Sequence, residues 1–182
     1  MNSIRGATLT LAFFHPLPDD PWINRLTAMV SRNDVCHAEL VFDGGGAQTQ
    51  AFSIQHGTTA SLRPKTLSNP AYELVTLSVS AQELAACKEF CANASKQEYG
   101  FDDVGMALSV VHPGGCCGRS SAQVSKTFCS KIITEAMQFA EMPEVQRMHP
   151  SSTTPSMLLE AVRESQRRVC HTVPSRMRAL KM

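Results

Sequence analysis

Residues 128–136 form the most informative stretch of the chain, Phe128-Cys129-Ser130-Lys131-Ile132-Ile133-Thr134-Glu135-Ala136. The apolar residues recur three and four positions apart, which predicts an amphipathic helix that begins near Cys129. Ile132 and Ile133 follow Cys129 by three and four residues, so the thiol lies on the face turned toward the protein. A thiol at a helix start ionises more readily than usual, because the helix dipole favours the thiolate there.

A strand with one histidine precedes this helix by about ninety residues and reads Cys36-His37-Ala38-Glu39-Leu40-Val41-Phe42. Side chains alternate between the two faces of a strand. Cys36, Ala38, Leu40 and Phe42 therefore form an apolar core face. His37 lies on the opposite face with Glu39 and Val41. An imidazole placed there could take the proton of a thiol, which is the pairing that a cysteine nucleophile needs.

The strand continues into a glycine turn at residues 43–46 and returns as a second strand over residues 47–54, which predicts an antiparallel hairpin. A third polar group should fix the orientation of the imidazole. We expect Gln50 in this role, with Glu39 and Gln48 as the next candidates. Glu39 shares a strand face with His37, but a parallel projection would direct its carboxylate past the ring.

Further strands are expected at residues 8–14, 61–63 and 72–79. The capping box that begins at Ser80 predicts a helix to about Ala94. A turn at residues 99–103 predicts another helix, and Thr154-Pro155-Ser156 opens the last one. This order of elements indicates an α+β fold with a central antiparallel sheet packed against helices. We expect one domain over residues 8–166 and a basic tail over residues 167–182.

The composition fits a globular protein, with 43% hydrophobic and 18% charged residues in a chain of 182. The net charge of +1 does not require nucleic acid or an anionic surface as a partner. The C-terminal tail is basic, and we interpret it as a solvated segment, with contact to an anionic partner as the alternative. Neither a signal peptide nor a transmembrane segment is evident. Seven cysteines, an odd number, do not suit a secreted disulfide framework, so we expect a cytoplasmic protein.

Other cysteine chemistry is weighed against this interpretation. Taken alone, Cys129 is better explained as a buried core residue than as a nucleophile, because free cysteine is among the most buried residue types. Cys87 and Cys91 have helical spacing and are interpreted as core residues. The vicinal pair Cys116-Cys117 could support thiol redox chemistry. As part of a zinc site, the pair lacks a second half with zinc-finger spacing. The sequence implies no cofactor and no metal.

The motifs occur in an order that resembles the circularly permuted papain-like group of the NlpC peptidase superfamily. Its branches include the YiiX-like and the lecithin:retinol acyltransferase-like proteins. The resemblance covers roughly residues 8–162. It is carried by the strand histidine, a Gln-Ala strand, a Phe-Asp turn, Phe-Cys-Ser and Thr-Pro-Ser, here His37, Gln50-Ala51, Phe101-Asp102, residues 128–130 and residues 154–156. The histidine precedes the cysteine, as in the permuted branch.

The resemblance implies a cysteine hydrolase, most readily a peptidase, amidase or isopeptidase that forms a thioester acyl-enzyme. Cys129 matches the nucleophile, His37 the general base, and Gln50 the third polar position. The implied substrate is a peptide, a protein or an acyl-amide. Within such families the chemistry is shared while the substrates differ, so an acyltransferase or lipid esterase is the alternative. A catalytically silent binding module of the same fold is a third interpretation.

Overall fold

The structure is a computed structural model of the chain. It describes residues 6–20, 24–25, 28, 34–42, 49–67, 70–103, 105–106 and 126–172, with side chains described up to residue 168. Three expectations lie outside these residues: the position of Gln48, the Cys116-Cys117 pair, and most of the helix expected after residue 103. The segment beyond residue 172 also lies outside them.

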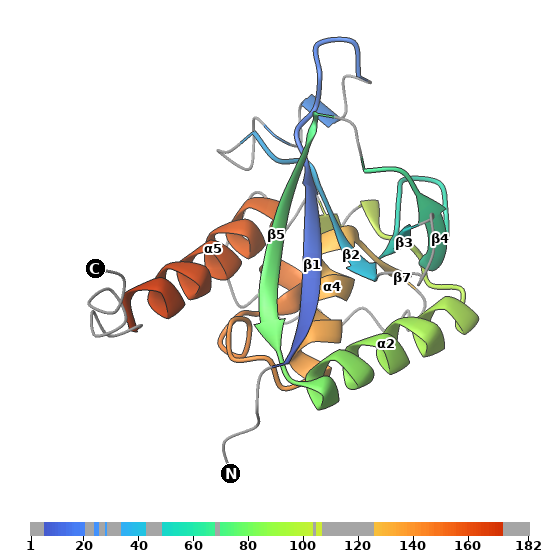
Figure 1. The fold of residues 1–182 in the computed structure, drawn as a ribbon. Coiled ribbons are helices and arrows are strands. Elements are labelled where there is room, and N and C mark those ends of the chain that lie inside the picture. Colours follow the sequence, from blue (N-terminus) through green and yellow to red (C-terminus); the bar gives the residue numbers. More distant parts are fainter. Residues whose placement is uncertain are drawn as a thin grey trace.

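A five-stranded antiparallel sheet forms the centre of the protein, in the order β4-β3-β2-β1-β5 (Figure 1). The strands are β1 (Ala7–Phe14), β2 (His37–Phe42), β3 (Thr49–Ser53), β4 (Ser61–Lys65) and β5 (Tyr72–Val79). The central strand β1 pairs with both β2 and β5, so that Leu11 lies opposite Leu40 on one side and opposite Val75 on the other. The expected α+β class and antiparallel sheet are confirmed.

Three helices pack against the apolar face of this sheet: α2 (Ala81–Lys96), α4 (Cys129–Phe139) and α5 (Pro155–Thr172). Helix α4 lies behind the strands in the view of Figure 1. Ile132 and Ile133 of α4 are fully buried in one core with Leu11, Leu40 and Phe52 of the sheet. Each such side chain contributes about 1.5–3 kcal/mol by leaving water.

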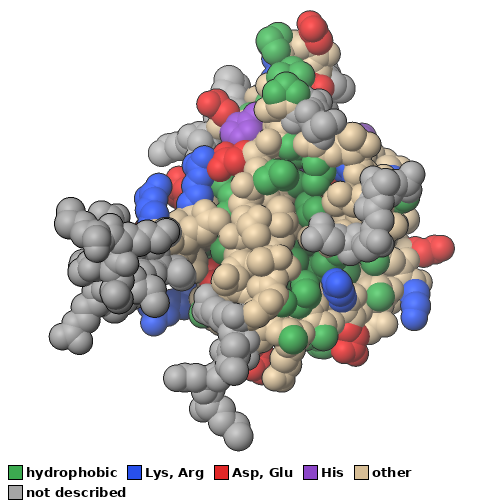
Figure 2. All heavy atoms as spheres, viewed as in Figure 1, with side chains coloured by type: hydrophobic (Ala, Val, Ile, Leu, Met, Phe, Trp, Pro, Cys, Tyr) green, Lys and Arg blue, Asp and Glu red, His purple; other side chains and the backbone are tan. Residues whose placement is uncertain are grey.

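In the view of Figure 1 no described helix lies in front of β1 and β5, and Figure 2 shows few charged side chains over these strands. Thr10 and Thr76 lie opposite each other here, with their hydroxyls 3.0 Å apart. The sheet therefore has a dry face toward the helices and a partly wet face on the other side. This second face matters for the site, because His37 and Glu39 belong to it, at a part of the sheet where Glu39 is fully buried.

Helix starts follow the sequence closely. Ser80 accepts a hydrogen bond from the Glu83 N–H, and the Glu83 carboxylate accepts one from the Ser80 N–H, so the expected capping box is confirmed. Thr154 accepts a hydrogen bond from the Met157 N–H at the start of α5. Helix α5 continues to Thr172, so the division expected between residues 166 and 167 falls inside a helix.

Two short strands precede the cysteine helix, and a short 3-10 turn follows it. Strands β6 (Gly100–Phe101) and β7 (Lys126–Thr127) form a small parallel pair that leads directly into α4. A 3-10 turn, η1 (Pro150–Ser152), packs against α4 and leads into α5. Within the described residues, no helix combines the length and the apolar composition needed to cross a membrane.

The hairpin of β2 and β3 has a register different from the expected one. A turn at residues 43–46 would place Phe42 opposite Ala47, whereas Phe42 lies opposite Gln50, a shift of three residues. Because side chains alternate, an odd shift moves every residue of the return strand to the other face. This register decides which glutamine can reach His37.

Candidate active site

Cys129 is the first residue of α4, and its side chain is only 3% exposed. Phe128 precedes it with an extended backbone and caps the helix with no side-chain hydrogen bond. The first backbone N–H groups of the helix are thus not taken by a capping side chain, and they point toward the thiol end of the helix.

The start of α4 is fixed to the next segment by a buried hydrogen bond. The Ser130 hydroxyl donates to the Thr153 carbonyl at 2.7 Å, and both residues are fully buried. Thr134 in turn donates to the Ser130 carbonyl at 2.7 Å. The Phe-Cys-Ser motif is therefore bonded to the residue that immediately precedes the Thr-Pro-Ser motif, and this contact fixes the start of α4.

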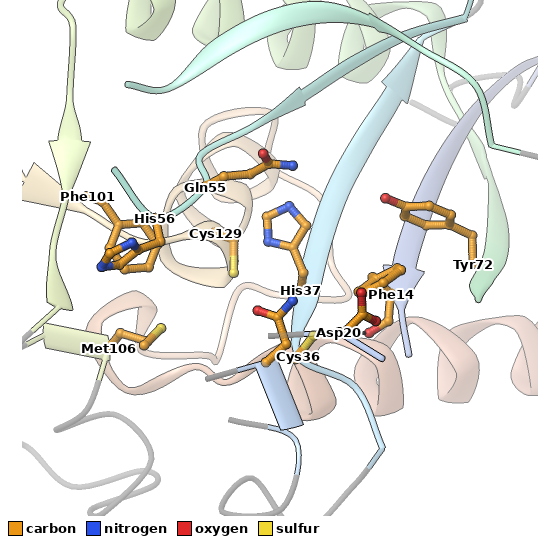
Figure 3. A pocket seen from close by; sticks show the side chains of 11 residues that line it. Phe14, Asp20, Cys36, His37, Gln55, His56, Tyr72, Phe101, Met106 and Cys129 are labelled. Carbon is orange, nitrogen blue, oxygen red and sulfur yellow. Dashed lines mark hydrogen bonds between the residues drawn. The ribbon is translucent and has the colours of Figure 1, made fainter. Parts of the chain in front are cut away.

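His37 begins β2, and the structure brings its imidazole beside the Cys129 sulfur (Figure 3), where each group shifts the pKa of the other. The His37 side chain is 15% exposed, so solvent reaches the ring only in part. The expected pairing of these two residues across about ninety positions is present in the fold. Nε2 of His37 is engaged elsewhere, which leaves Nδ1 for the sulfur.

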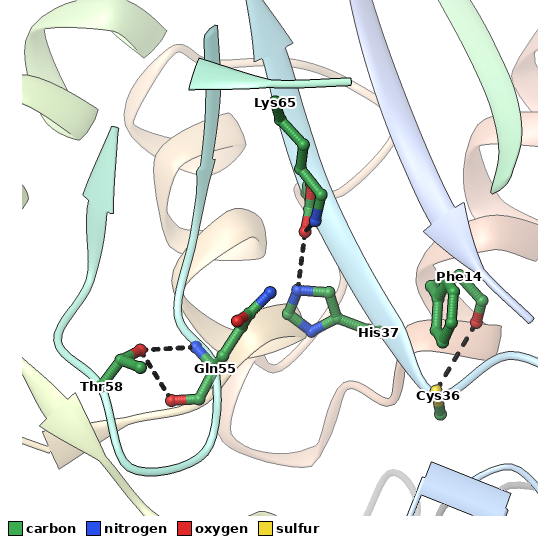
Figure 4. A network of polar contacts seen from close by, with 7 residues as sticks. Phe14, Cys36, His37, Gln55, Thr58 and Lys65 are labelled. Carbon is green, nitrogen blue, oxygen red and sulfur yellow. Dashed lines mark hydrogen bonds and ion pairs between the residues drawn. The ribbon is translucent and has the colours of Figure 1, made fainter. Parts of the chain in front are cut away.

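Glu39, not Gln50, contacts the second imidazole nitrogen. Nε2 of His37 donates to Oε1 of Glu39 at 3.1 Å (Figure 4). The Glu39 side chain is fully buried, and Nζ of Lys65 forms an ion pair with the same oxygen. The expectation that Glu39 would point past the ring is wrong. Residues i and i+2 lie about 6–7 Å apart along a strand, and side-chain torsions let a flexible carboxylate lean across that gap.

Gln50 does not reach the site, for two reasons that follow from the register. It lies opposite Phe42, five residues along β2 from His37, which is about 17 Å at the rise of a strand. It also shares the core face with Phe42, whereas His37 lies on the other face. The expectation that Gln50 orients the imidazole is therefore corrected to Glu39.

The pKa of His37 is raised to about 9. Burial of the ring opposes this shift, because desolvation disfavours the charged imidazolium. The negative charge and hydrogen bond of the Cys129 thiolate outweigh the burial, and the hydrogen bond and charge of Glu39 add to them. His37 is consequently held as an imidazolium at neutral pH.

The pKa of Cys129 is lowered, although burial alone would raise it. The positive charge of His37 and its hydrogen bond are the largest opposing causes. The backbone N–H groups of Ala38 and Ser130 add hydrogen bonds to the sulfur. The lowered pKa of Cys129 and the raised pKa of His37 both favour the thiolate–imidazolium form of this pair, the form that is reactive in cysteine nucleophiles.

The polar groups behind His37 stabilise this state. Burial would raise the pKa of Glu39, but His37 and Lys65 together lower it, so the carboxylate stays charged. Lys65 keeps its proton because Glu39 and the Tyr72 hydroxyl more than offset its own burial. Its ammonium lies 4.9 Å from the centre of the Tyr72 ring. The second Glu39 oxygen, Oε2, is buried with no hydrogen-bond partner among the described residues.

Cys36 offers a contrast within the same cavity. Its pKa is raised to about 12, by burial first and then by the nearby Cys129 charge. Its sulfur donates to the Phe14 carbonyl at 3.7 Å. Two thiols thus line one cavity, and only Cys129 has an imidazole partner.

The thiol opens into a cavity of about 480 Å³ (Figure 3). Its walls include aromatic and sulfur-containing side chains, and His37 and Cys129 lie between those on its two sides. The walls include Phe14, Cys36, Tyr72, Phe101 and Met106. This volume suits a ligand of modest size whose buried part is apolar.

Gln55 also lines the cavity, and its side chain points toward the His37 ring (Figures 3 and 4). The register of β2 and β3, continued past the last pair, places Gln55 across from His37. Sequence reasoning missed this residue, because only the true register distinguishes it from Gln48 and Gln50. His56 follows it at the rim, packed edge-on against Phe101 with ring centres 5.6 Å apart. His56 also lies 3.1 Å from an Asp103 oxygen.

In the part of the chain that the structure describes, no cluster of three His, Cys, Asp or Glu side chains forms a metal site. Cys87 and Cys91 are fully buried in the core, as expected. Comparison with protein-family models and with curated proteins gave no match. The geometry around Cys129 is therefore the basis of the functional argument.

Proposed function

We propose that this protein is a cysteine hydrolase that cleaves an amide bond in a peptide, a protein or an acyl-amide. The observation that carries the proposal is the Cys129 thiol beside His37 at one cavity, with the far nitrogen of His37 held by the buried carboxylate of Glu39. Nucleophile, base and orienting group occur in the order that acyl transfer needs. Cys129 and His37 also line a cavity, whereas the absence of a cleft beside them would have favoured a catalytically silent module.

The reaction follows from these roles. The Cys129 thiolate attacks the carbonyl carbon and forms a carbon–sulfur bond, and the carbonyl oxygen takes up the negative charge. The His37 imidazolium then gives its proton to the leaving nitrogen as the carbon–nitrogen bond breaks. Water, deprotonated by neutral His37, attacks the resulting thioester and releases a carboxylic acid. Cys129 returns to the thiolate and His37 to the imidazolium. The net reaction is therefore an amide plus water giving a carboxylic acid plus an amine.

The tetrahedral oxyanion needs hydrogen-bond donors positioned in advance. The backbone N–H of Cys129, at the uncapped start of α4, provides one. We assign the second to the side-chain amide of Gln55, which points toward the reacting pair from the end of β3. The role of Glu39 is to position: it holds the His37 ring and keeps it charged, and it touches neither substrate nor sulfur.

The fold agrees with a permuted papain-like arrangement, in which the histidine strand precedes the cysteine helix and an antiparallel sheet packs against it. The same machinery would serve an acyltransferase if an alcohol or amine replaced water on the thioester. The aromatic cavity is compatible with an apolar acyl group in either reaction. We place hydrolysis first because the proposal then requires no second substrate.

An acyl-enzyme trap tests the proposal. The protein is mixed with a library of peptidyl and fatty-acyl aminomethylcoumarin amides, quenched in acid, and digested for mass spectrometry. We expect coumarin release together with an acyl mass on the peptide that contains Cys129. Cys129→Ala should abolish both signals, whereas Cys36→Ala in the same cavity should retain them. Release that survives Cys129→Ala would refute the proposal.

A further inference from the structure

A second hollow, of about 210 Å³, lies next to the catalytic cavity and shares Gln55 with it. Its floor is the wet face of β3 and β4, where Ala51 lies opposite Arg63 and Ser53 opposite Ser61. This is the same sheet face that carries His37 and Glu39. The hollow exists because three small side chains, those of Ala51, Ser53 and Ser61, line its base.

The lining of this hollow is polar and positively charged. Thr58, Ser53 and Ser61 contribute hydroxyls, and Arg63 and Lys65 contribute cations. The Lys65 charge is already balanced by Glu39. Arg63 is different: its Nε donates to the Ser61 hydroxyl at 2.7 Å, and no described carboxylate lies within ion-pair distance of its guanidinium.

Arg63 is thus an exposed cation, oriented by one hydrogen bond and without a counter-charge among the described residues, at the edge of a small hollow. The bond from Nε orients the guanidinium plane and leaves its two terminal nitrogens for a ligand. A guanidinium in this state binds a carboxylate or a phosphate with two parallel hydrogen bonds. The Thr58 and Ser61 hydroxyls already donate to the carbonyls of Gln55 and Thr59, which leaves the Ser53 hydroxyl to donate to an oxygen of such a group.

We propose that this hollow binds an anionic group of the substrate, a carboxylate or a phosphate, while the scissile carbonyl lies at Cys129. The inference rests on the proposed hydrolase function and adds a substrate class to it: an amide with an apolar part in the larger cavity and an anionic group in the smaller one. Gln55, at the junction of the two, lies beside the bond that is cleaved.

Bromoacetyl amides test this directly, because they alkylate the thiol and need no known substrate. One series has a terminal carboxylate on spacers of increasing length, a second has a terminal phosphate, and a third has a neutral methylamide. The alkylation rate of Cys129 is measured in the parent protein, in Arg63→Gln, and in Arg167→Gln. The last removes one exposed charge from α5 and serves as the matched control.

We expect an anionic probe of one particular length to react about tenfold faster than its neutral counterpart, the factor that one charge-assisted hydrogen bond supplies. Arg63→Gln should remove this preference and leave the neutral rate unchanged, whereas Arg167→Gln should preserve both. The series with the larger preference identifies the anion as carboxylate or phosphate. The proposal is overturned if the parent protein shows no preference for an anionic probe, or if Arg63→Gln keeps the same preference as Arg167→Gln.

The neutral probe separates this inference from the proposed function. If it labels Cys129 no faster than Cys36, the activated thiolate is refuted, whatever the anion preference shows. Equilibrium binding then tests the hollow without the thiol: calorimetry on Cys129→Ser uses the acetyl analogue of the best probe. Binding that is about tenfold weaker in Cys129→Ser/Arg63→Gln supports the hollow, and equal binding overturns it.

Discussion

Glu39 accepts a hydrogen bond at 3.1 Å from Nε2 of His37, two residues before it on the same strand. One strand thus supplies both the base and the group that orients it, and Lys65 from β4 holds the carboxylate from behind. The hydrogen bond between His37 and Glu39 does not depend on the register of β2 and β3. The orientation of the imidazole is therefore a local property of β2, supported by one cation from outside.

Replacing Glu39 by glutamine should slow alkylation of Cys129 by iodoacetamide at neutral pH by about tenfold to a hundredfold. The pKa of His37 falls when the carboxylate charge is lost, so the imidazolium stabilises the thiolate less. The alkaline limit of turnover should move below about 9 for the same reason. Alkylation rates and turnover, each measured across pH, provide the check.

Gln50→Ala is the paired control, because the structure places Gln50 opposite Phe42 and away from the ring. It should leave the alkylation rate and its pH dependence unchanged. A loss in Gln50→Ala as large as in Glu39→Gln would contradict the assignment of the orienting group.

Gln55→Ala should lower kcat about a hundredfold or more, the usual cost of removing one oxyanion donor. Alkylation of Cys129 involves no oxyanion, so its rate should stay within about twofold of the parent rate. Turnover and alkylation measured on the same preparations separate the two roles. An equal loss in both would show that Gln55 acts on the thiol instead of on the oxyanion.

Lys65→Met should lower the free energy of unfolding by about 3 kcal/mol at neutral pH, because the buried Glu39 carboxylate loses one of its two cationic partners and keeps only His37. The folded pKa of Glu39 is lowered, so the stability from its charge is present above its ordinary value of 4.5 and is lost as pH falls below it. The difference between parent and variant should therefore shrink in acid. Urea titrations at several pH values measure this, and a difference independent of pH would contradict it.

Ser130→Ala removes the buried hydrogen bond to the Thr153 carbonyl and leaves that carbonyl without this donor. The free energy of unfolding should fall by about 1–3 kcal/mol. Ser151, which is exposed on the neighbouring turn, gives the matched control, and Ser151→Ala should change stability by less than about 0.5 kcal/mol. Thermal and urea unfolding measure both variants. Equal effects of the two substitutions would show that the hydrogen bond from Ser130 to the Thr153 carbonyl contributes nothing specific to stability.

The helix starts were predictable from the sequence because their signals are local. Ser80 and Glu83 form the capping box within four residues, and Ile132 and Ile133 indicate the buried face of the Cys129 helix without information from elsewhere. The same holds for the alternation in β2, which separated His37 from the core face. The meeting of Cys129 and His37 was inferred from their roles, and the fold brings them together.

The identity of the orienting residue was not predictable in the same way. It depended on a hairpin register, and the glycine turn at residues 43–46 did not fix where the return strand begins its pairing. The pairing is shifted by three residues from the expected register, which moves Gln50 to the core face and places Gln55 across from His37. Glu39 was visible on the correct face, and only the freedom of its side chain was underestimated. Arg63 and the second hollow depend on the β3–β4 pairing and had no local signal.

The pH dependence of turnover gives a further test of the ion pair. Turnover should require both the Cys129 thiolate and the His37 imidazolium, so its profile should be bell-shaped with an alkaline limit near about 9. The acid limit should lie below the ordinary thiol value of 9.0, because the Cys129 pKa is lowered. A profile that only rises toward alkaline pH would indicate a free thiol without an imidazolium partner.

The most direct test of the thiolate–imidazolium pair is the iodoacetamide labelling rate of Cys129 at mildly acidic pH, with Cys36 as an internal reference in the same cavity. We predict that Cys129 labels at least a hundredfold faster than Cys36, whose pKa is raised to about 12, and that His37→Gln removes this advantage. Equal labelling of the two cysteines, or fast labelling of Cys129 that persists in His37→Gln, would contradict the proposed pair.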